Sequence, residues 1–174
     1  MATIGFSVKF PWGEETHFVP KIWKGLVDYN GYTIADIFLY AVAIEEKGLI
    51  DKLFPHNLEN IFPKIHTIRE DKANLWKPGR KIHPVVFNRT KDRFQFAPVL
   101  ECKSVQEFEI EYINNGNEVI IVIDGTHFYN SLLNINKGIG ELATNDGFIS
   151  PLYFLSFFKE NFRGKIIHWT EFKY

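Results

Sequence analysis

The sequence predicts an α+β fold in which a small, mostly antiparallel β-barrel is flanked by helices. Six or seven segments have the composition of strands, and most of them are joined by short turns. Two or three further segments have helical periodicity, without the regular alternation of strands and helices that marks a parallel sheet. The length of 174 residues and the hydrophobic content of 45% suit a single domain with one core.

The first part of the chain predicts one strand and a helical segment. Residues 4–10 alternate apolar side chains with small or polar ones, which is typical of a half-buried strand, and Pro11 ends the pattern. Thr33 followed by Asp36 predicts a capping box at the start of a helix. The apolar stripe of this helix consists of Ile34, Ile37, Phe38, Ala41 and Ile44. We expect the stripe to pack on the outside of the barrel, because it is too apolar to remain in water.

A second short helical turn is predicted at residues 57–62, ended by Pro63. The central part of the chain then changes to strand-like segments at 64–69, 81–87 and 93–100. Polar turns at 77–79 and 88–92 separate them, so this part predicts a meander.

The rest of the chain predicts a hairpin, two helices and a last strand. Residues 107–112 and 119–123 flank the turn pair Asn115-Gly116, which is a strong hairpin signal. A helix is expected over 134–144, and Ser150-Pro151 predicts the start of another helix that carries Leu152, Leu155, Phe158 and Phe162. Residues 165–172 form the expected closing strand, which we predict to pair near the strand at 64–69, as does the strand that begins at Ile4.

Charge is distributed unevenly along the chain. The net charge is −1, but residues 64–93 carry nine Lys or Arg against three acids, a local net of +6 that leaves −7 on the remainder. Such a split indicates one basic face for an anionic partner, or else a set of solvated loop charges.

Several classes of protein are disfavoured by what the sequence lacks. It has no phosphate-binding loop, no dinucleotide fingerprint and no zinc-protease motif. The six histidines show no pair at metal-ligand spacing, and no cofactor is indicated. Cys102 is the only cysteine, no apolar run is long enough for a membrane span, and the first residues do not match a signal peptide. We therefore expect a cytoplasmic protein without a membrane partner.

One segment stands out as a candidate site. It reads Lys64-Ile-His-Thr67-Ile-Arg69 and is followed by Trp76-Lys77-Pro-Gly79 and a strand. The order Lys-x-x-Thr-Ile-Arg, a short loop and a Lys-x-Gly turn resembles the ASCH domain, a PUA-like relative of RNA-modifying proteins. The later order of Asp146-Gly147-Phe148, a capped helix and a closing strand is also similar. The resemblance covers residues 4–10 and 63–172, and residues 24–62 look like a helical insertion.

The resemblance implies a cleft beside the motif strand that binds RNA, a nucleotide or a modified nucleoside. In small bacterial members a Lys, a Thr and a Glu hydrolyse acetylated cytidine. By position these catalytic roles fall on Lys64, Thr67 and Asp146, with Asp in place of Glu, and Glu141 is the alternative acid. Arg69, Trp76, Lys77, Arg80 and Lys81 are the expected ligand contacts, through phosphate pairing or base stacking.

The geometry of a strand sets a condition on this site. Thr67 and Arg69 share one face of a regular strand, whereas Lys64 would point to the other face. Lys64 can join them only if it precedes the strand proper, in the bend that Pro63 favours.

Three functions therefore remain open. The first is a binding module for RNA, a nucleotide or a modified nucleoside in a basic cleft. The second is an amidohydrolase of the same fold, which needs Lys64, Thr67 and an acid in one pocket. The third is a protein-interaction domain that uses the insertion, which needs an exposed apolar face on residues 24–62.

Overall fold

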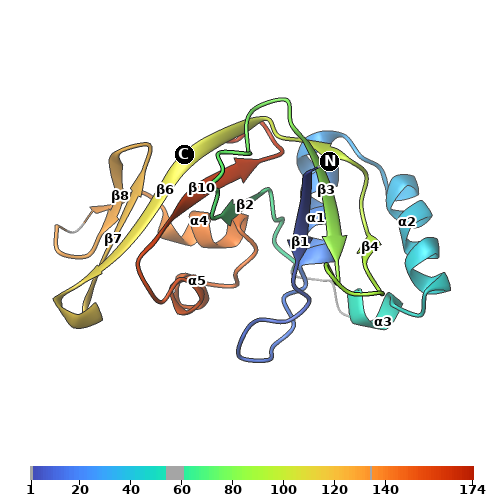
Figure 1. Ribbon diagram of the computed structural model, residues 1–174, viewed down its shortest axis with the longest axis horizontal. Coiled ribbons are helices and arrows are strands. Elements are labelled where there is room, and N and C mark those ends of the chain that lie inside the picture. The colour runs from blue at the N-terminus through green and yellow to red at the C-terminus, as the bar shows by residue number, and fades with distance from the viewer. Residues whose placement is uncertain (1, 54–60, 134) are drawn as a thin grey trace.

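The computed structural model describes residues 2–53, 61–133 and 135–174 and has an α+β fold with mostly antiparallel strand pairs (Figure 1). The strands are β1 (Ala2–Phe6), β2 (His66–Arg69), β3 (Lys81–Val86), β4 (Phe94–Gln95), β5 (Leu100–Glu101), β6 (Ser104–Ile113), β7 (Glu118–Ile123), β8 (Thr126–Asn130), β9 (Ile135–Asn136) and β10 (Phe162–His168). The helices are α1 (Phe18–Asn30), α2 (Ile34–Glu46), α3 (Ile50–Leu53), α4 (Ile139–Asn145) and α5 (Pro151–Phe157), with a 3₁₀ turn η1 at Asn114–Gly116.

The larger sheet has the strand order β2-β10-β6-β7-β8-β9, and every pair in it is antiparallel. The hairpin predicted around Asn115-Gly116 is confirmed as β6, η1 and β7. β10 lies between β2 and β6, with Lys165 opposite Arg69 on one side and opposite Glu107 on the other. The predicted pairing of the closing strand with the motif strand is therefore confirmed, although β10 ends at His168 and not at Phe172.

The smaller sheet joins β1 to β3 in parallel, and β3 also pairs with β4 and β5. The predicted pairing of the first strand with the motif strand is wrong, because Ile4 faces Pro84 of β3. The first strand is also shorter than expected and ends at Phe6. The strand expected over 93–100 is split into β4 and β5 with Pro98 between them, since proline offers no N–H to a ladder. The strands of the described residues are therefore arranged in two sheets.

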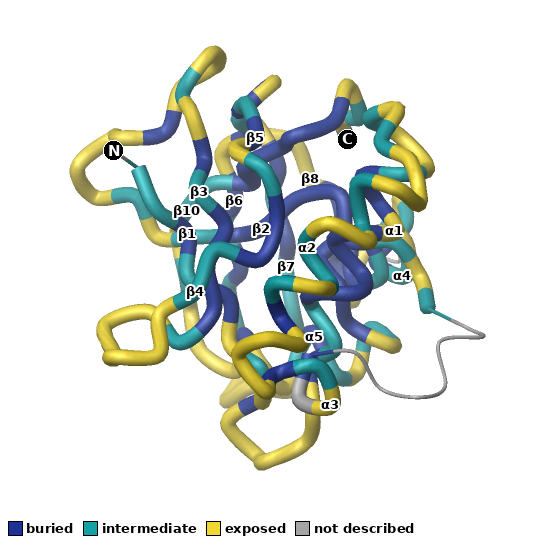
Figure 2. Tube along the Cα trace, turned by 90° about the vertical axis from the view of Figure 1, so that its right-hand side faces the viewer, coloured by how far each residue is buried: buried dark blue, intermediate teal, exposed yellow. Residues whose placement is uncertain are grey.

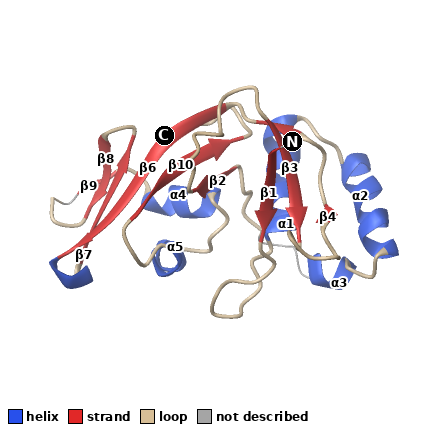
Figure 3. Ribbon diagram, in the orientation of Figure 1, coloured by secondary structure: helices blue, strands red, loops and turns tan. Residues whose placement is uncertain are grey.

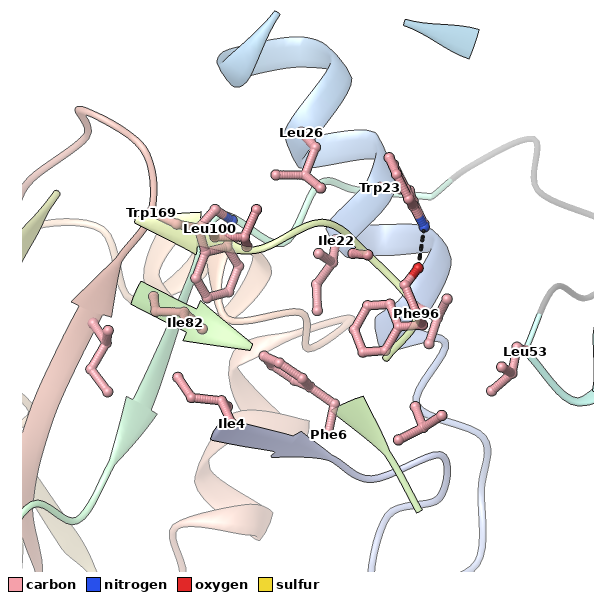
Figure 4. Close-up of a cluster of buried hydrophobic side chains, with 14 of the residues drawn as sticks. Ile4, Phe6, Ile22, Trp23, Leu26, Leu53, Ile82, Phe96, Leu100 and Trp169 are labelled. Atoms are coloured by element: carbon pink, nitrogen blue, oxygen red, sulfur yellow. Dashed lines mark hydrogen bonds between the residues drawn. The ribbon is translucent and has the colours of Figure 1, made fainter. Parts of the chain in front are cut away.

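A hydrophobic core lies between the smaller sheet and α1. Ile22, Trp23 and Leu26 of α1 are fully buried among side chains that include Phe6 and Phe96. Figure 4 shows Trp23 donating from Nε1 to the carbonyl oxygen of Phe96, a bond of 3.1 Å. Helix α1 was not predicted as a separate helix, and it begins at Phe18, before the expected insertion. It packs into the core, so residues 24–30 of the expected insertion are not a peripheral appendage.

Helix α2 begins at the predicted capping box, in which the Thr33 hydroxyl and the Asp36 carboxylate each accept from the other residue's backbone N–H. The predicted burial of its stripe is wrong for two residues, because Ile34 is 79% exposed and Phe38 is 66% exposed. Ile44 is buried, and Ile37 packs against the core from the same side of the helix. Figure 2 shows α2 with intermediate and exposed residues along most of its length. The helix is apolar on both sides, so its composition did not indicate which side is buried.

A second core lies under the larger sheet, on the face that α4 and α5 cover (Figure 3). Ser150 caps α5 as predicted, its hydroxyl accepting from the N–H of Tyr153. Of the side chains predicted on this helix, Phe158 is buried, Leu152 is exposed and Phe162 lies in β10, whereas the buried Phe154 was not predicted. The helix predicted over 134–144 begins only at Ile139, because β9 occupies Ile135–Asn136. The helical turn predicted at residues 57–62 falls mostly outside the described residues. No helix of the described residues is long and apolar enough to cross a membrane.

Candidate functional site

The bend before β2 is fixed by backbone hydrogen bonds to two other elements. The N–H of Lys64 donates to the carbonyl of Lys21 in α1 at 2.9 Å, and the N–H of Ile65 donates to the carbonyl of Asn145 at the end of α4 at 3.0 Å. β2 begins only at His66. Lys64 therefore precedes the strand, which meets the geometric condition set by the sequence.

Lys64 and Asp146 form a buried pair at the centre of this site. Lys64 is 1% exposed and Asp146 is 4% exposed. The Lys64 ammonium donates to both the backbone carbonyl and the carboxylate Oδ1 of Asp146. It also lies 4.7 Å from the centre of the Phe18 ring.

Gly147 makes this close approach possible. Its φ of +89° is a backbone conformation that side chains rarely adopt, and a Cβ there would lie 3.0 Å from Cδ of Lys64 and 2.9 Å from the Phe18 ring. The Asp146-Gly147 pair therefore ends α4 and at the same time places the acid against Lys64.

Burial shifts the ionisation of both partners toward their neutral forms. It lowers the pKa of Lys64 to about 8, although the charge of Asp146 opposes this shift. It raises the pKa of Asp146, against the opposing effects of Lys64, Arg69 and a backbone hydrogen bond from Ile68. A lysine with such a pKa is neutral in an appreciable fraction of molecules near neutral pH, as a general base requires.

Thr67 and Arg69 project from the same face of β2, as their spacing predicts. Thr67 is 3% exposed. The Arg69 guanidinium donates from Nη2 to the carbonyl of Gly5 at 3.0 Å and lies 5.5 Å from the centre of the Phe6 ring. Gly164 on β10 allows β2 to approach closely, because a Cβ at position 164 would lie 2.4 Å from the carbonyl oxygen of Arg69.

Lys64, Thr67, Arg69 and Asp146 line one pocket of about 270 Å³, which we call the motif pocket. Its other lining residues are Ser7, Lys9, Phe10, Pro11, Thr16, Phe18, Ile68, Phe148 and Phe157. The phenylalanines form apolar walls, and the rings of Phe10 and Phe148 are stacked 5.5 Å apart. The pocket thus combines flat apolar walls with Lys64, Thr67, Arg69 and Asp146.

The other predicted ligand contacts do not reach this pocket. Trp76 is buried in the core, and the guanidinium of Arg80 lies 5.8 Å from its ring and donates to the carbonyl of Leu75. Lys81 is paired with Glu101 at 2.7 Å on the surface, and Lys77 is exposed. Glu141, the alternative acid, lines a different cavity. The basic cleft expected from Lys77, Arg80 and Lys81 is therefore not assembled at the motif pocket.

Three parts of the site were missed by sequence reasoning, and the first two are the loop before α1 and Lys21. Residues 7–16 form a loop closed by the Lys9–Glu15 bridge and by the Thr16 hydroxyl, which donates to the carbonyl of Ser7 at 2.7 Å. Lys21 lies behind the motif pocket and donates to the carbonyls of Thr16 and Gly147, and burial lowers its pKa to about 8. A signal for α1 was present, since Val19, Ile22, Trp23 and Leu26 follow helical spacing.

His66 also lies close to Asp146 and is the third part that was missed. The imidazole is fully buried, with Nε2 2.8 Å from the Tyr174 hydroxyl and Nδ1 3.9 Å from Oδ1 of Asp146. Burial and the nearby His168 and Lys64 hold the pKa of His66 well below its usual value, so the ring is neutral. No group of three or more His, Cys, Asp or Glu positioned for a metal ion occurs among the described residues.

No family model, curated protein or solved structure matches this chain.

Proposed function

We propose that this chain is an ASCH-like domain whose motif pocket binds a modified nucleoside or its base. The observation that carries the proposal is the meeting of Lys64, Thr67, Arg69 and Asp146 in one pocket, although Asp146 lies far from the other three in sequence. We also propose that the fold of this chain is related to the PUA-like barrel. It is supported by the mostly antiparallel strands and by the pairing of the motif strand β2 with β10.

The dimensions and walls of the motif pocket favour a small flat ligand. Its volume of about 270 Å³ is close to the lower end of the range for small-molecule sites, about 300 to 1,000 Å³. Aromatic walls can stack on a base, while Thr67 and Arg69 offer hydrogen bonds to its polar edge. The position of Lys77, Arg80 and Lys81 outside the pocket favours a single nucleoside over a long RNA strand held along those residues.

Calorimetric titration with cytidine and N4-acetylcytidine tests this function. We expect saturable binding by the wild type and a loss of about tenfold or more in affinity for Thr67→Val, because this change removes a hydrogen-bonding group and keeps the shape of the side chain. Lys81→Gln is the matched control, since Lys81 lies on the surface outside the pocket. The absence of saturable binding to either compound would contradict the proposal.

A second candidate function is amide hydrolysis, which is favoured by the lowered pKa of Lys64 in the same pocket as Thr67. Neutral Lys64 would accept the proton of the Thr67 hydroxyl while Oγ1 attacks the acyl carbon of the ligand. Arg69 would stabilise the oxyanion, and Lys64 would return the proton to the departing amine as the C–N bond breaks. Water would then hydrolyse the acyl-threonine ester and release the carboxylic acid. Asp146 would orient the Lys64 side chain, both as the free amine and as the ammonium.

Release of acetate from N4-acetylcytidine tests this reaction. We expect turnover by the wild type to rise with pH and to level off above about pH 8, as Lys64 loses its proton. Thr67→Val and Lys64→Met should each abolish turnover, whereas Thr67→Ser should retain part of it because the nucleophilic oxygen is kept. Equal activity in the wild type and Thr67→Val would rule out this reaction while leaving the binding function in place.

A further inference from the structure

A second cavity adjoins the motif pocket on the other side of Arg69. It has a volume of about 520 Å³ and is lined by Gly5, Phe6, Ser7, Val8, Lys9, Arg69, Phe87 and Asn88. Ser7, Lys9 and Arg69 line both cavities. A ligand that occupies the motif pocket can therefore extend past Arg69 into the second cavity.

The guanidinium of Arg69 has donor capacity for such an extension. An arginine side chain carries five N–H donors, and among the described residues one hydrogen bond is seen, from Nη2 to Gly5. This bond and the Phe6 ring hold the guanidinium in place. A cation positioned in this way is suited to bind an oxyanion through two parallel hydrogen bonds.

The charges around the second cavity favour an anion. None of the described residues that line it is acidic, whereas Arg69, Lys9 and the Asn88 carboxamide supply donors. The loop that follows Asn88 adds the exposed side chains of Arg89, Lys91 and Arg93 against one acid, Asp92. By contrast, the cavity beside β6 has acids in its lining, since Glu70, Asp71, Glu107 and Glu109 line it together with the bases Lys72, Arg163 and Lys165. Of the basic residues in the segment 64–93, Arg69 lines the second cavity, and the basic loop begins directly after Asn88 in its lining.

We propose that the second cavity is a phosphate subsite and that the ligand of the motif pocket is a nucleotide. This inference rests on the proposed function, because the base occupies the motif pocket while the phosphate binds Arg69. Ser7, Lys9 and Asn88 complete the subsite. The phosphate belongs either to a mononucleotide or to the backbone of a short RNA, since both present the same oxyanion to the guanidinium.

The test compares ligands that differ only in their phosphates. We titrate the full chain with cytidine, with its 5′- and 3′-monophosphates, and with a cytidine-containing dinucleotide. One of the monophosphates should bind about 10- to 100-fold more tightly than cytidine, which corresponds to one charge-assisted contact. Inorganic phosphate should compete with that monophosphate and leave cytidine binding unchanged. If the dinucleotide binds more tightly than the monophosphate, the phosphate belongs to the backbone of RNA. Equal affinity for the two ligands identifies a mononucleotide.

Two variants locate the effect. Arg69→Gln should abolish the advantage of the monophosphate. Lys9→Gln should reduce this advantage without risk to folding, because the Lys9 side chain is 61% exposed. The Lys9 ammonium is paired with the Glu15 carboxylate at 3.4 Å. Lys24→Gln is the matched control, since Lys24 is likewise an exposed lysine paired with an acid, Asp28, and is not among the described residues that line either cavity.

The outcomes separate this inference from the proposed function. Equal affinity for cytidine and both monophosphates would overturn the phosphate subsite and leave nucleoside binding in place. If the monophosphate keeps its advantage over cytidine in both Arg69→Gln and Lys9→Gln, the phosphate does not bind in the second cavity. Failure of every ligand to bind would overturn the proposed function and the subsite together.

Discussion

A Cβ atom on Gly25 would lie 2.5 Å from the carbonyl oxygen of Lys64, so α1 and the bend before β2 meet backbone to backbone. This contact allows the Lys64 N–H to reach the carbonyl of Lys21 on the preceding turn of the helix. Any side chain at position 25 must push the helix away from the bend. The position of Lys64 therefore depends on a glycine in a different element.

Gly25→Ala is expected to lower the free energy of unfolding by about 1 to 3 kcal/mol and to weaken ligand binding, because overpacking displaces the bend. Gly140→Ala is the matched control, since Gly140 is also in a helix but no described residue beyond its own helix neighbours has an atom within 4 Å of its Cβ position. This control should gain up to about 1 kcal/mol from the better helix propensity of alanine. Urea unfolding of both variants measures the difference, and an equal effect of the two changes would show that the close contact is absent.

Stability should increase at alkaline pH because of the two buried lysines. The pKa values of Lys64 and Lys21 are lowered from 10.5 to about 8, so between these values the unfolded chain binds more protons than the folded chain. The free energy of unfolding then rises with pH, by up to about 1.4 kcal/mol per pH unit for each lysine. Urea unfolding from about pH 7 to about pH 10.5 should show a shallower rise for Lys64→Met than for the wild type. Lys24→Met, at an exposed position, should follow the wild-type slope, and parallel curves for all three proteins would show that Lys64 keeps its usual pKa.

Stability should fall in mild acid because of the buried histidines. Burial lowers the pKa of His168 to about 4 and holds that of His66 well below 6.5, so below pH 6.5 the unfolded chain takes up protons that the folded chain does not. The free energy of unfolding should decrease by up to about 2.7 kcal/mol per pH unit when both contribute. A His66→Gln/His168→Gln variant should lose less stability than the wild type between about pH 6.5 and about pH 4, after subtraction of its packing loss at about pH 7. A variant curve parallel to that of the wild type would mean that both rings are protonated in the folded chain.

The two sides of α2 should respond differently to substitution. Phe38 is 66% exposed, so Phe38→Glu should change the free energy of unfolding by no more than about 0.5 kcal/mol. Ile44 is fully buried, and Ile44→Ala should cost about 2 to 5 kcal/mol. Thermal or urea unfolding of the two variants compares the sides directly. A large loss for Phe38→Glu would show that the exposed apolar side is covered in solution, as a protein-interaction function of this helix requires.

The sequence predicted the parts of the fold that depend on local patterns. Asn115-Gly116 between alternating segments predicted the β6–β7 hairpin, and Thr33 with Asp36 predicted the start of α2. The requirement that Lys64 precede β2 also followed from local geometry, because side chains alternate along a strand.

Features that depend on distant partners could not be predicted in this way. The parallel pairing of β1 with β3 leaves no local signature, since it depends on where the intervening helices pack. The exposure of Phe38 and the burial of Trp76 are decided by the same tertiary contacts. The resemblance grouped Lys64, Thr67 and Asp146, but it did not indicate that Lys77 and Arg80 lie outside the motif pocket.

The position of β10 between β2 and β6 has a consequence for the rate of folding. The β6–β7 hairpin can form early because its strands are adjacent in sequence. Among the described strands, β2 pairs in this sheet with β10 alone, and Ile68 lies opposite Ile166. β2 and β10 lie far apart in the sequence, so their pairing closes a long loop. The chain loses entropy before the new contacts compensate for it, and the pairing is therefore a slow step, typical of domains that fold in milliseconds to seconds. The motif strand should therefore acquire its final position late, after the hairpin that supports β10 has formed.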